Sequence, residues 1–374
     1  MTTVSWLGCN VVTGQIIEQL PEIVPSGSLS HLLSAYTSTA FRLPIPLGGQ
    51  GAPPRNWEAA TEAGRTMVIA VVNDQPVWAG LVLTRNSGTA ATDELGCVSL
   101  EGYLDRRYVG THTWTEQDQT SVIATGLIGD ANTTEGIGFT VDAPASGVTR
   151  TRAYKDQDDK TVYAALQELS GVIAGPEWTV VLDWTDATQT AVKKTLRVRQ
   201  RIGFLAEPPS PTRPTGNASA VFTSTGESDS RYKFSEDFTS SKGANHIVAT
   251  SSGEGDTRPQ SSPARDTALL GIGWPRYEHR FTPSESISDI ATLDSHAAKA
   301  LTLMSRGARL LKLTARADAY PRLGVDWNTG DDIGFELTGH RHPTGLTGVG
   351  RAIGWEFHPR SGVVEPILLL PGTP

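Results

Sequence analysis

The sequence predicts a mainly β protein with a mixed α+β part, long enough at 374 residues for two or three domains. Three observations predict this class. The longest apolar runs, such as Met67–Val72 and Ile367–Leu370, have the length of strands and fall far short of a bilayer span. Gly (38) and Pro (23) are as abundant as in proteins built from short strands and turns. Helical periodicity occurs only in a few segments between strand-rich regions.

The first third predicts strands, one short helix and a hairpin. Strands run from Val4 to Val12 and resume after a Thr13-Gly14 turn. Over Ser28–Tyr36 the apolar residues recur at helical spacing, which predicts a short helix. Met67–Val72 and Pro76–Leu83 flank Asn73-Asp74-Gln75, which predicts a hairpin. A further strand is expected over Gly96–Tyr103, and Leu104–Arg107 closes this unit.

The middle third predicts two helices and a strand pair. Asp118 is a candidate cap of a helix that Gly129 ends. A second helix is expected to start at Asp158 or Asp159 and to end at Gly171, with one apolar face. The strand pair covers Trp178–Trp184 and Lys194–Arg201. The solvent-exposed face of its second strand is expected to carry Arg197, Arg199 and Arg201.

The last third returns to strands after a Pro-, Ser- and Thr-rich linker over residues 207–219. A long helical pattern covers Ser284–Met304, where Ser286 and Asp289 fit a capping box. Strands are expected around this helix, at Val221-Phe222, His246–Ala249, Leu310–Ala315, Ile333–Leu337, Val349–Phe357 and Val363–Leu370. We therefore predict three domains: residues 1–107, residues 108–203 with mixed α/β structure, and residues 204–374 with a helical insertion at about 284–306. Two strand-rich regions of related size thus flank a mixed domain.

Composition limits the classes of function. The formal net charge is −8, from 40 acidic and 32 basic residues, which argues against a protein that grips nucleic acid through its phosphates. Neither a signal peptide nor a membrane span is expected, so we expect folding in a cytoplasm. Cys9 and Cys97 are expected to be buried, inert thiols.

Catalytic motifs are missing from the sequence. It has no His-Glu-x-x-His helix, no Gly-x-Ser-x-Gly elbow and no Gly-x-x-x-x-Gly-Lys phosphate loop. Gly348, Gly350 and Gly354 resemble a dinucleotide turn but lie in a strand-rich region with no helix after them, so strand bends explain them better. A carboxylate pair distant in the chain remains an open alternative.

Two sets of residues have the chemistry of metal ligands. His340, His342 and His358 offer three imidazoles, although a polar loop with an exposed Arg341 between two histidines explains the first two better. The acidic residues Asp156, Asp158 and Asp159 could bind calcium or could stabilise a helix N-terminus. The second interpretation is preferred in each case, as is turn chemistry for Asp331-Asp332. We therefore assign no catalytic, cofactor-binding or metal-ligating residue.

The order of features resembles that of the hub, or minor tail, proteins of long-tailed bacteriophages. Asn73–Gly80 and Leu104–Arg107 are similar to the first barrel of that family, in which a turn precedes a Trp-x-Gly strand. The later part of the chain contributes short similarities at Gly253–Gly255, Leu293–Ala297, Trp327–Asp331, Gly350–Gly354 and Gly362–Glu365. The resemblance spans nearly the whole chain in short, degenerate pieces.

This resemblance implies two tube-like β-barrel domains with an intervening α/β domain, and a non-enzymatic structural role. Three chains would form a ring of pseudo-sixfold symmetry that joins the tail tube to the tip and gates DNA passage. The implied partners are two further copies of the chain, the tail tube or distal tail ring protein, the tape-measure protein and tail-tip or fibre proteins. DNA would pass without specific binding. The implied location is the tail tip of the virion, assembled in the host cytoplasm.

Three alternatives remain open. A receptor- or carbohydrate-binding tail component would use exposed tryptophans to stack on sugars, and the candidates for that role are Trp78, Trp178, Trp184, Trp274, Trp327 and Trp355. A cell-wall hydrolase of the tail tip would need a carboxylate pair that sequence motifs do not reveal. A β-rich assembly protein of a related, non-phage injection machine would be expected to have the same composition and strand pattern.

Overall fold

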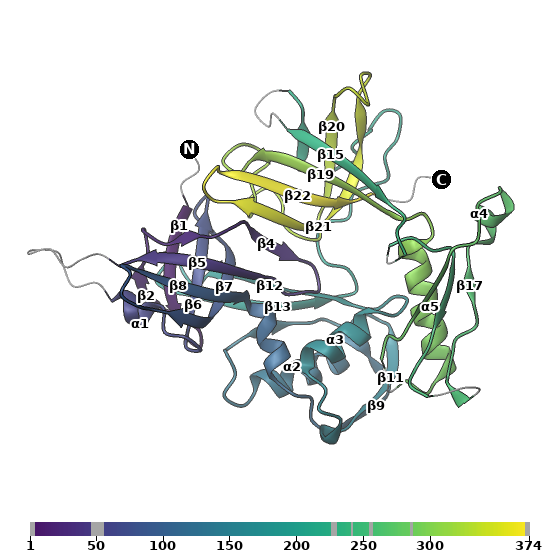
Figure 1. Ribbon diagram of the computed structural model, residues 1–374, viewed down its shortest axis with the longest axis horizontal. Coiled ribbons are helices and arrows are strands. Elements are labelled where there is room, and N and C mark those ends of the chain that lie inside the picture. Colours follow the sequence, from purple (N-terminus) through teal and green to yellow (C-terminus); the bar gives the residue numbers. More distant parts are fainter. Residues whose placement is uncertain are drawn as a thin grey trace, which may run out of the picture.

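The computed structural model describes residues 4–45, 56–225, 230–240, 242–253, 257–284 and 287–370 (Figure 1). The chain is mainly β with a smaller helical part, as predicted. Its strands form two seven-stranded sheets, two three-stranded sheets and a two-stranded ribbon. No helix among the described residues is long and apolar enough to cross a membrane.

The first large sheet uses strands from the N-terminal third, in the order β2-β1-β6-β7-β8-β5-β3. Its strands are β1 (Val4–Asn10), β2 (Ile16–Gln19), β3 (Val24–Pro25), β5 (Ser38–Pro44), β6 (Thr66–Val72), β7 (Gln75–Asn86) and β8 (Thr92–Ser99), with the short helix α1 (Trp57–Ala60) before β6. The predicted β6–β7 hairpin is confirmed. Asn73 and Asp74 both have positive φ (51° and 61°), as a two-residue type I′ turn requires.

Strand β6 is buried along its whole length because it lies between two cores. Val68, Ala70 and Val72 face a core shared with the second large sheet. Met67, Ile69 and Val71 face a core shared with the helices and strands of the middle region. Burial on both faces explains why its sequence is a continuous apolar run.

The middle region packs helices against a three-stranded sheet and a ribbon. Its elements are η1 (Leu100–Arg106), β9 (His112–Asp118), η2 (Gln119–Ala124), α2 (Thr125–Asn132), β10 (Thr140–Asp142), β11 (Thr149–Tyr154), η3 (Asp156–Asp158), α3 (Val162–Ser170), β12 (Glu177–Trp184) and β13 (Val192–Arg199). Asp118 caps the first helical segment as predicted, since its side chain accepts hydrogen bonds from the N–H groups of Thr120 and Ser121.

Three boundaries predicted for this region are wrong. The helix does not end at Gly129 but continues to Asn132, because its apolar side chains remain buried there. The second helix is capped by Thr161 rather than by an aspartate, since η3 intervenes. The strand expected over Gly96–Tyr103 ends at Ser99 and continues as the 3-10 helix η1.

The second large sheet is formed by the C-terminal strands in the order β14-β20-β21-β22-β19-β15. These are β14 (Val221–Thr223), β15 (Arg231–Asp237), β19 (Ala308–Arg316), β20 (Asp332–Leu337), β21 (Leu346–His358) and β22 (Val363–Leu369). Residues 238–307, between β15 and β19, form a small lobe of β16 (His246–Ala249), β17 (Ala264–Arg265), α4 (Thr267–Gly271), β18 (Glu278–Phe281) and α5 (Ile290–Met304). Asp289 caps α5, which is shorter than predicted, and Ser286 lies outside the described residues.

The two large sheets repeat one topology. The path β6-β7-β8-β5-β3 of the first sheet corresponds to β20-β21-β22-β19-β15 of the second, and every pair in both paths is antiparallel. Each long central strand also carries a bulge against the next strand, at Val82/Thr84 in β7 and at Ala352/Gly354 in β21. The edge strands differ, because β1 is antiparallel to β6 whereas β14 is parallel to β20. The coarse similarity of two strand-rich regions thus extends to strand order and bulge position.

Backbone pairing closes neither sheet into a barrel among the described residues. In the second sheet, side chains cover the opening. The Arg341 guanidinium lies over the Phe234 ring at 5.1 Å and 3.7 Å from Glu236, and Tyr232 contacts His342 at 6.1 Å between ring centroids. These contacts join the edge strand β15 to the β20–β21 loop without a ladder of backbone hydrogen bonds.

The helix predicted over Ser28–Tyr36 is wrong. Leu29–Leu32 form strand β4, which pairs antiparallel with β21 of the second large sheet. Leu29 is fully buried, and the backbone of the segment is satisfied by a partner more than 300 residues away in the sequence. The helical spacing of Leu29 and Leu32 covers less than one turn and is a weak signal, so long-range pairing decided the outcome. Figure 1 shows β4 leaving the first sheet to lie along β21.

Replacement of Leu29 by alanine tests the contribution of β4 to stability. Because Leu29 is fully buried, we expect Leu29→Ala to lower the free energy of unfolding by about 3 kcal/mol. The matched control is Leu303→Ala on α5, where the side chain is 55% exposed and the expected loss is below about 0.5 kcal/mol. Urea denaturation followed by tryptophan fluorescence measures both. Equal losses for the two variants would contradict the packing described for β4.

Candidate functional site: the junction of the two sheets

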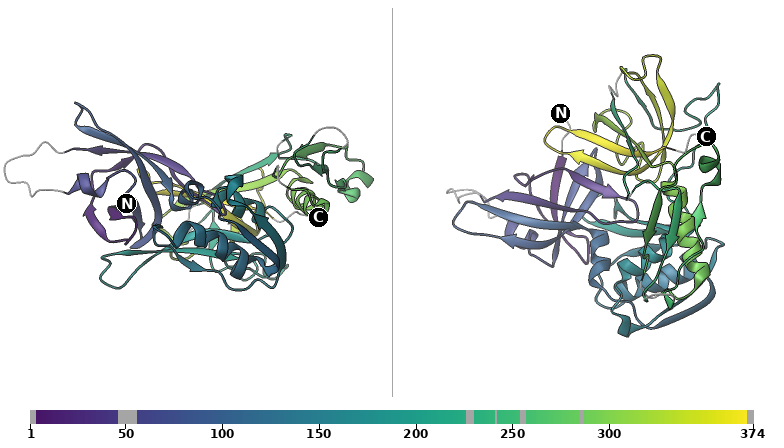
Figure 2. Two further views of the ribbon diagram at one scale, coloured as in Figure 1. Left: turned by 90° about the horizontal axis from the view of Figure 1, so that it is seen from below. Right: turned by 45° about the vertical axis from the view of Figure 1, so that its right-hand side comes forward.

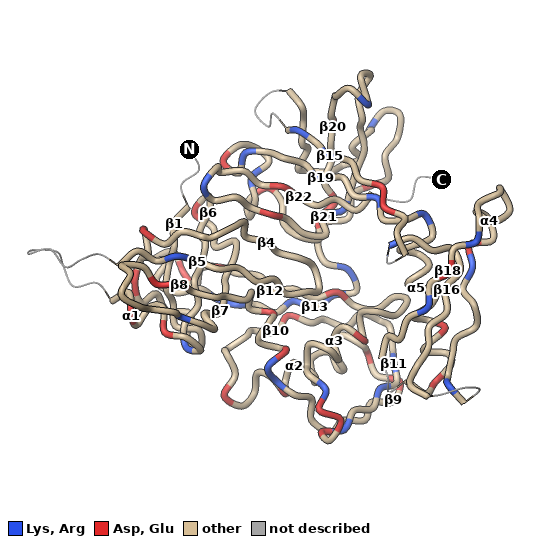
Figure 3. The backbone as a smooth tube through the Cα atoms, in the orientation of Figure 1, with Lys and Arg blue, Asp and Glu red and all other residues tan. Residues whose placement is uncertain are grey.

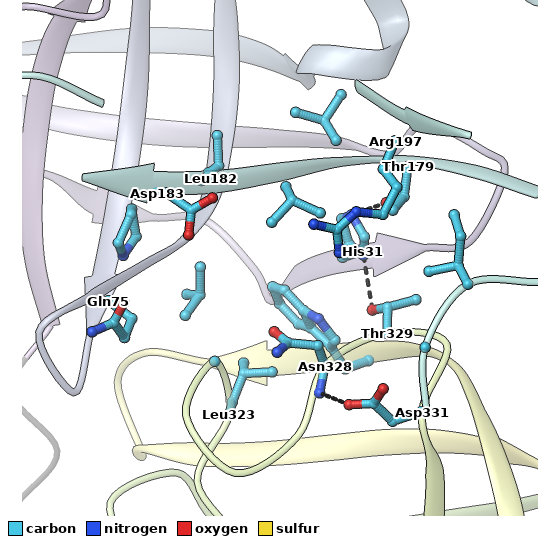
Figure 4. A pocket seen from close by; sticks show the side chains of 18 residues that line it. His31, Gln75, Thr179, Leu182, Asp183, Arg197, Leu323, Asn328, Thr329 and Asp331 are labelled. Carbon is cyan, nitrogen blue, oxygen red and sulfur yellow. Dashed lines mark hydrogen bonds between the residues drawn. The ribbon is translucent and has the colours of Figure 1, made fainter. Parts of the chain in front are cut away.

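The two large sheets and the middle region meet around β4, β12 and the loop before β20 (Figure 4). Arg351 of β21 binds Glu177 of β12 with a two-pronged ion pair, of which the Nη1–Oε1 distance is 2.5 Å. The same guanidinium donates to the Ile202 carbonyl at 3.0 Å. Both side chains are about one-fifth exposed, so the pair is largely shielded from water. A planar, two-pronged pair of this kind fixes the relative orientation of β21 and β12.

His31 is the centre of the junction. Its Nδ1 lies 3.0 Å from the Thr329 hydroxyl and its Nε2 lies 3.1 Å from the Thr179 hydroxyl. The ring also stacks on Trp355 of β21, with 5.7 Å between centroids. One side chain from β4 therefore contacts the second sheet, the loop before β20 and β12. Because both ring nitrogens are engaged, His31 is positioned as a structural connector rather than as a free general base.

A buried carboxylate completes this cluster. Glu101 is 2% exposed, lies 3.4 Å from His31 Nε2 and accepts a hydrogen bond from the Val180 N–H at 3.0 Å. Burial alone would raise the pKa of Glu101, but the hydrogen bond and charge of His31, together with the backbone hydrogen bonds, lower it below its ordinary value. Glu101 is thus held ionised beside His31.

A cavity of about 190 Å³ adjoins this cluster. Figure 4 shows its polar lining, with His31, Thr179 and Arg197 on one side and Asn328, Thr329 and Asp331 on the other. The volume is below the 300–1,000 Å³ or so of typical small-molecule sites. The lining has hydrogen-bonding groups suited to ordered water, which would extend the junction network.

The Asp331-Asp332 pair connects residues 201–206, just before the predicted linker, to the second sheet. Asp331 accepts hydrogen bonds from the N–H groups of Phe204 (2.7 Å) and Asn328 (2.8 Å). Asp332 forms an ion pair with Arg201 at 2.6 Å and accepts from the Ala206 N–H at 2.9 Å. The predicted turn chemistry is therefore only part of their role, since both carboxylates also anchor a segment from the middle of the chain.

The predicted histidine group does not assemble. His340 and His342 precede β21, whereas His358 ends it. Thirteen residues of extended strand span roughly 40 Å, so the three imidazoles cannot share one ion. His358 instead lies near Glu356 and Glu365. The ammonium of Lys312 already sits 2.7 Å from each of these carboxylates, so a cation of the chain itself neutralises the cluster.

The other candidate residues have structural surroundings. Cys9 and Cys97 are buried, as predicted, and burial raises the pKa of each thiol to about 12. Asp156 and Asp158 belong to η3, and Asp159 follows it with positive φ. Four of the six tryptophans considered for sugar binding are at most 3% exposed, namely Trp78, Trp178, Trp327 and Trp355. Trp184 donates to the Asp74 carbonyl, and Trp274 is 37% exposed.

Sequence reasoning missed the residues that form the junction. His31, Glu101, Glu177 and Arg351 stand in four separate segments; the first three belong to no motif, and Arg351 lies in the Gly350–Gly354 similarity, which assigns it no role. The available signal was indirect, since an isolated histidine and glutamate within apolar strand patterns require partners when buried. Their identity as partners depends on the pairing of β4 with β21.

The glutamine variant of Glu101 tests the charge at the junction. Glu101→Gln removes a buried charge that accepts hydrogen bonds, and we expect it to lower the free energy of unfolding by about 1–3 kcal/mol at pH 7. Because the pKa of Glu101 is lowered in the folded state, the stability that its ionised form contributes is present above its ordinary pKa and is lost as the pH falls below it. The difference between wild type and variant should therefore shrink between pH 6 and pH 3.5.

Urea titrations at several pH values measure this effect, with Glu94→Gln as the control. Glu94 is an exposed glutamate on β8, with a side chain 63% exposed. A stability difference for Glu101→Gln that grows towards low pH would contradict the assignment of an ionised Glu101.

No protein-family model matches the chain, and no curated protein matches it by sequence. Solved structures do match. The tail protein from Neisseria meningitidis MC58 aligns with 99% of this chain and 97% of its own, at 14% identity and a TM-score of 0.55. The 43 kDa tail protein of prophage MuSo2 from Shewanella oneidensis aligns with 99% of this chain and 98% of its own, at 12% identity and a TM-score of 0.56.

Both matches cover nearly the whole of each chain, so the shared architecture includes the two large sheets and the elements between them. At this level of identity the comparison establishes the fold. The resemblance to phage tail proteins predicted from short sequence similarities is therefore confirmed at the level of the fold, which this chain shares with these two tail proteins, one of them from a prophage.

Proposed function

We propose that the chain is a structural, non-enzymatic hub protein of a phage tail tip. In this role three copies form a ring that joins the tail tube to the tip and gates the passage of DNA. The proposal is supported by the nearly full-length fold similarity to two proteins described as tail proteins.

The repeated sheet topology is the observation that carries this proposal. Each chain contains two sheets with the same five-strand path and a bulge at the same place in the central strand. A trimer of such chains presents six similar sheets. This is the number needed to match a sixfold tube on one side while keeping threefold symmetry on the other. Curled sheets placed side by side in this way would act as two tube-like barrel domains per chain.

The charge distribution suits a conduit through which DNA passes. Figure 3 shows acidic and basic residues interspersed along both large sheets, and the net charge of the chain is −8. A continuous basic surface would hold DNA by counterion release, whereas a mixed or acidic surface lets it slide. In this proposal DNA passes through the ring transiently and is not bound as a specific ligand.

The proposed partners follow from the position of such a ring. On one side lie the tail tube or a distal tail ring protein and the tape-measure protein, and on the other lie tail-tip or fibre proteins. The proposed location is the tail tip of the virion, with assembly in the host cytoplasm. The domain division at residues 107 and 203 belongs to this proposal, with one tube-like unit on either side of the middle region.

The solution mass and negative-stain images of the purified chain test this proposal. We expect a mass three times that of the chain, and particles with threefold or pseudo-sixfold outline and a central hole. Because open sheet edges would be covered by neighbouring subunits, the interfaces should bury more than about 2,000 Å² in total. A monodisperse monomer at high concentration, without rings in the images, would contradict the hub assignment.

A further inference from the structure

The two large sheets share one topology, but their central strands β7 and β21 differ in backbone pairing beyond the bulge. Beyond its bulge, β21 is paired on both sides: Gly354, Trp355 and Glu356 pair with β22 on one side and with β4 on the other. When the two bulges are aligned, the corresponding residues of β7 are Thr84, Arg85 and Asn86. They pair with β8 on one side and have no backbone partner on the other among the described residues.

The unpaired edge of β7 is accessible. Leu83, the bulged residue, is 40% exposed, and Thr84 and Asn86 are exposed as well. The neighbouring contacts come from the segment around α1, where Gly64 donates to the Val82 carbonyl at 2.7 Å and Arg85 reaches the Glu58 carbonyl at 2.7 Å. Within the part of the chain that the structure describes, the last paired position on this side is therefore Val82, and the strand continues beyond it without a backbone partner. We call Leu83–Asn86 the open edge of β7.

The equivalent edge of β21 is occupied by a strand, which indicates the kind of segment that the open edge of β7 can bind. Its occupant, β4, comes from the connection between β3 and β5 of the other sheet. In the repeated topology the connection between β15 and β19 takes the corresponding place, and it is the lobe of residues 238–307. Within one chain, β4 from the β3–β5 connection of the first sheet thus pairs with β21 of the second sheet. The lobe is the counterpart that would reach β7 of a first sheet, and its described residues do not pair with β7 of their own chain.

The shape of the chain fits contact between copies rather than within one. Figures 1 and 2 place the lobe and the β7–β8 hairpin towards opposite ends of the long axis. A contact between the lobe of one copy and the open edge of the next is head-to-tail, and contacts of this kind form a ring when the rotation between neighbouring copies closes, as the proposed trimer requires. The lobe also offers an extended segment, because β18 pairs with β16 on one side and lies at the edge of its sheet.

From these observations we infer that the open edge of β7 binds the lobe of a second copy of this chain, by strand addition in the manner of β4 on β21. The inference rests on the proposed ring and identifies where its subunits join. Backbone hydrogen bonds supply the affinity in such a contact, and the exposed Leu83 supplies an apolar anchor.

A charge at the open edge tests the inference. We expect Leu83→Lys to weaken ring assembly about tenfold or more, because a lysine on an exposed strand edge opposes strand addition. The matched control is Val122→Lys, which places the same charge at an aliphatic residue 36% exposed in the middle region. Analytical ultracentrifugation over a range of concentrations measures assembly, and circular dichroism verifies that both variants are folded.

Hydrogen exchange of the wild-type chain provides a second readout that needs no variant. The peptide containing residues 83–86 should be more protected in the ring than in the dilute monomer. If the wild type forms rings but Leu83→Lys assembles like Val122→Lys and the peptide gains no protection, the subunits join elsewhere and this inference fails while the hub proposal stands. A wild type that forms no ring overturns both.

Discussion

The pairing of β4 with β21 is the contact on which the rest of the structure depends. Four residues of the N-terminal region, Leu29–Leu32, become part of the C-terminal sheet, so this region is joined to that sheet by backbone hydrogen bonds and not only by an apolar interface. This pairing brings His31 to Thr179, Thr329 and Trp355. It also carries the buried core across both sheets, since Leu29, Trp78 and Phe357 belong to one cluster.

This junction holds three parts of the chain together, as the proposed role requires. The Arg351–Glu177 pair, the Asp332–Arg201 pair and the His31–Glu101 contact join these parts at neighbouring points. Each would contribute little at an exposed surface, but here the pairs are largely shielded from water, which makes their geometry more restrictive. Two similar sheets held at a fixed angle are a suitable unit for a closed ring.

Local chemistry determined what the sequence could predict. The β6–β7 hairpin was predictable because Asn73 and Asp74 suit a type I′ turn, and Asp118 was recognisable as a helix cap. Strand β4 was not predictable, because Leu29 and Leu32 have the i, i+3 spacing of a helix and lie on opposite faces of a strand, and the deciding partner lies at Gly354–Phe357. The junction residues were not predictable for the same reason. His31 and Glu101 show no sequence signal of their own, and they come into contact only because β4 pairs with β21. Open sheets in place of closed barrels also reflect long-range geometry that strand patterns do not encode.

Hydrogen exchange at β4 tests most directly whether the two sheets form one body. The account predicts that amides of residues 29–32 exchange as slowly as those of 354–357, their partners in β21, and that both sets become exposed only in the global unfolding transition. Mass spectrometry of overlapping peptides across a denaturant series resolves the two segments. Rapid exchange of residues 29–32 under native conditions, with 354–357 still protected, would show that β4 detaches freely and would contradict the account.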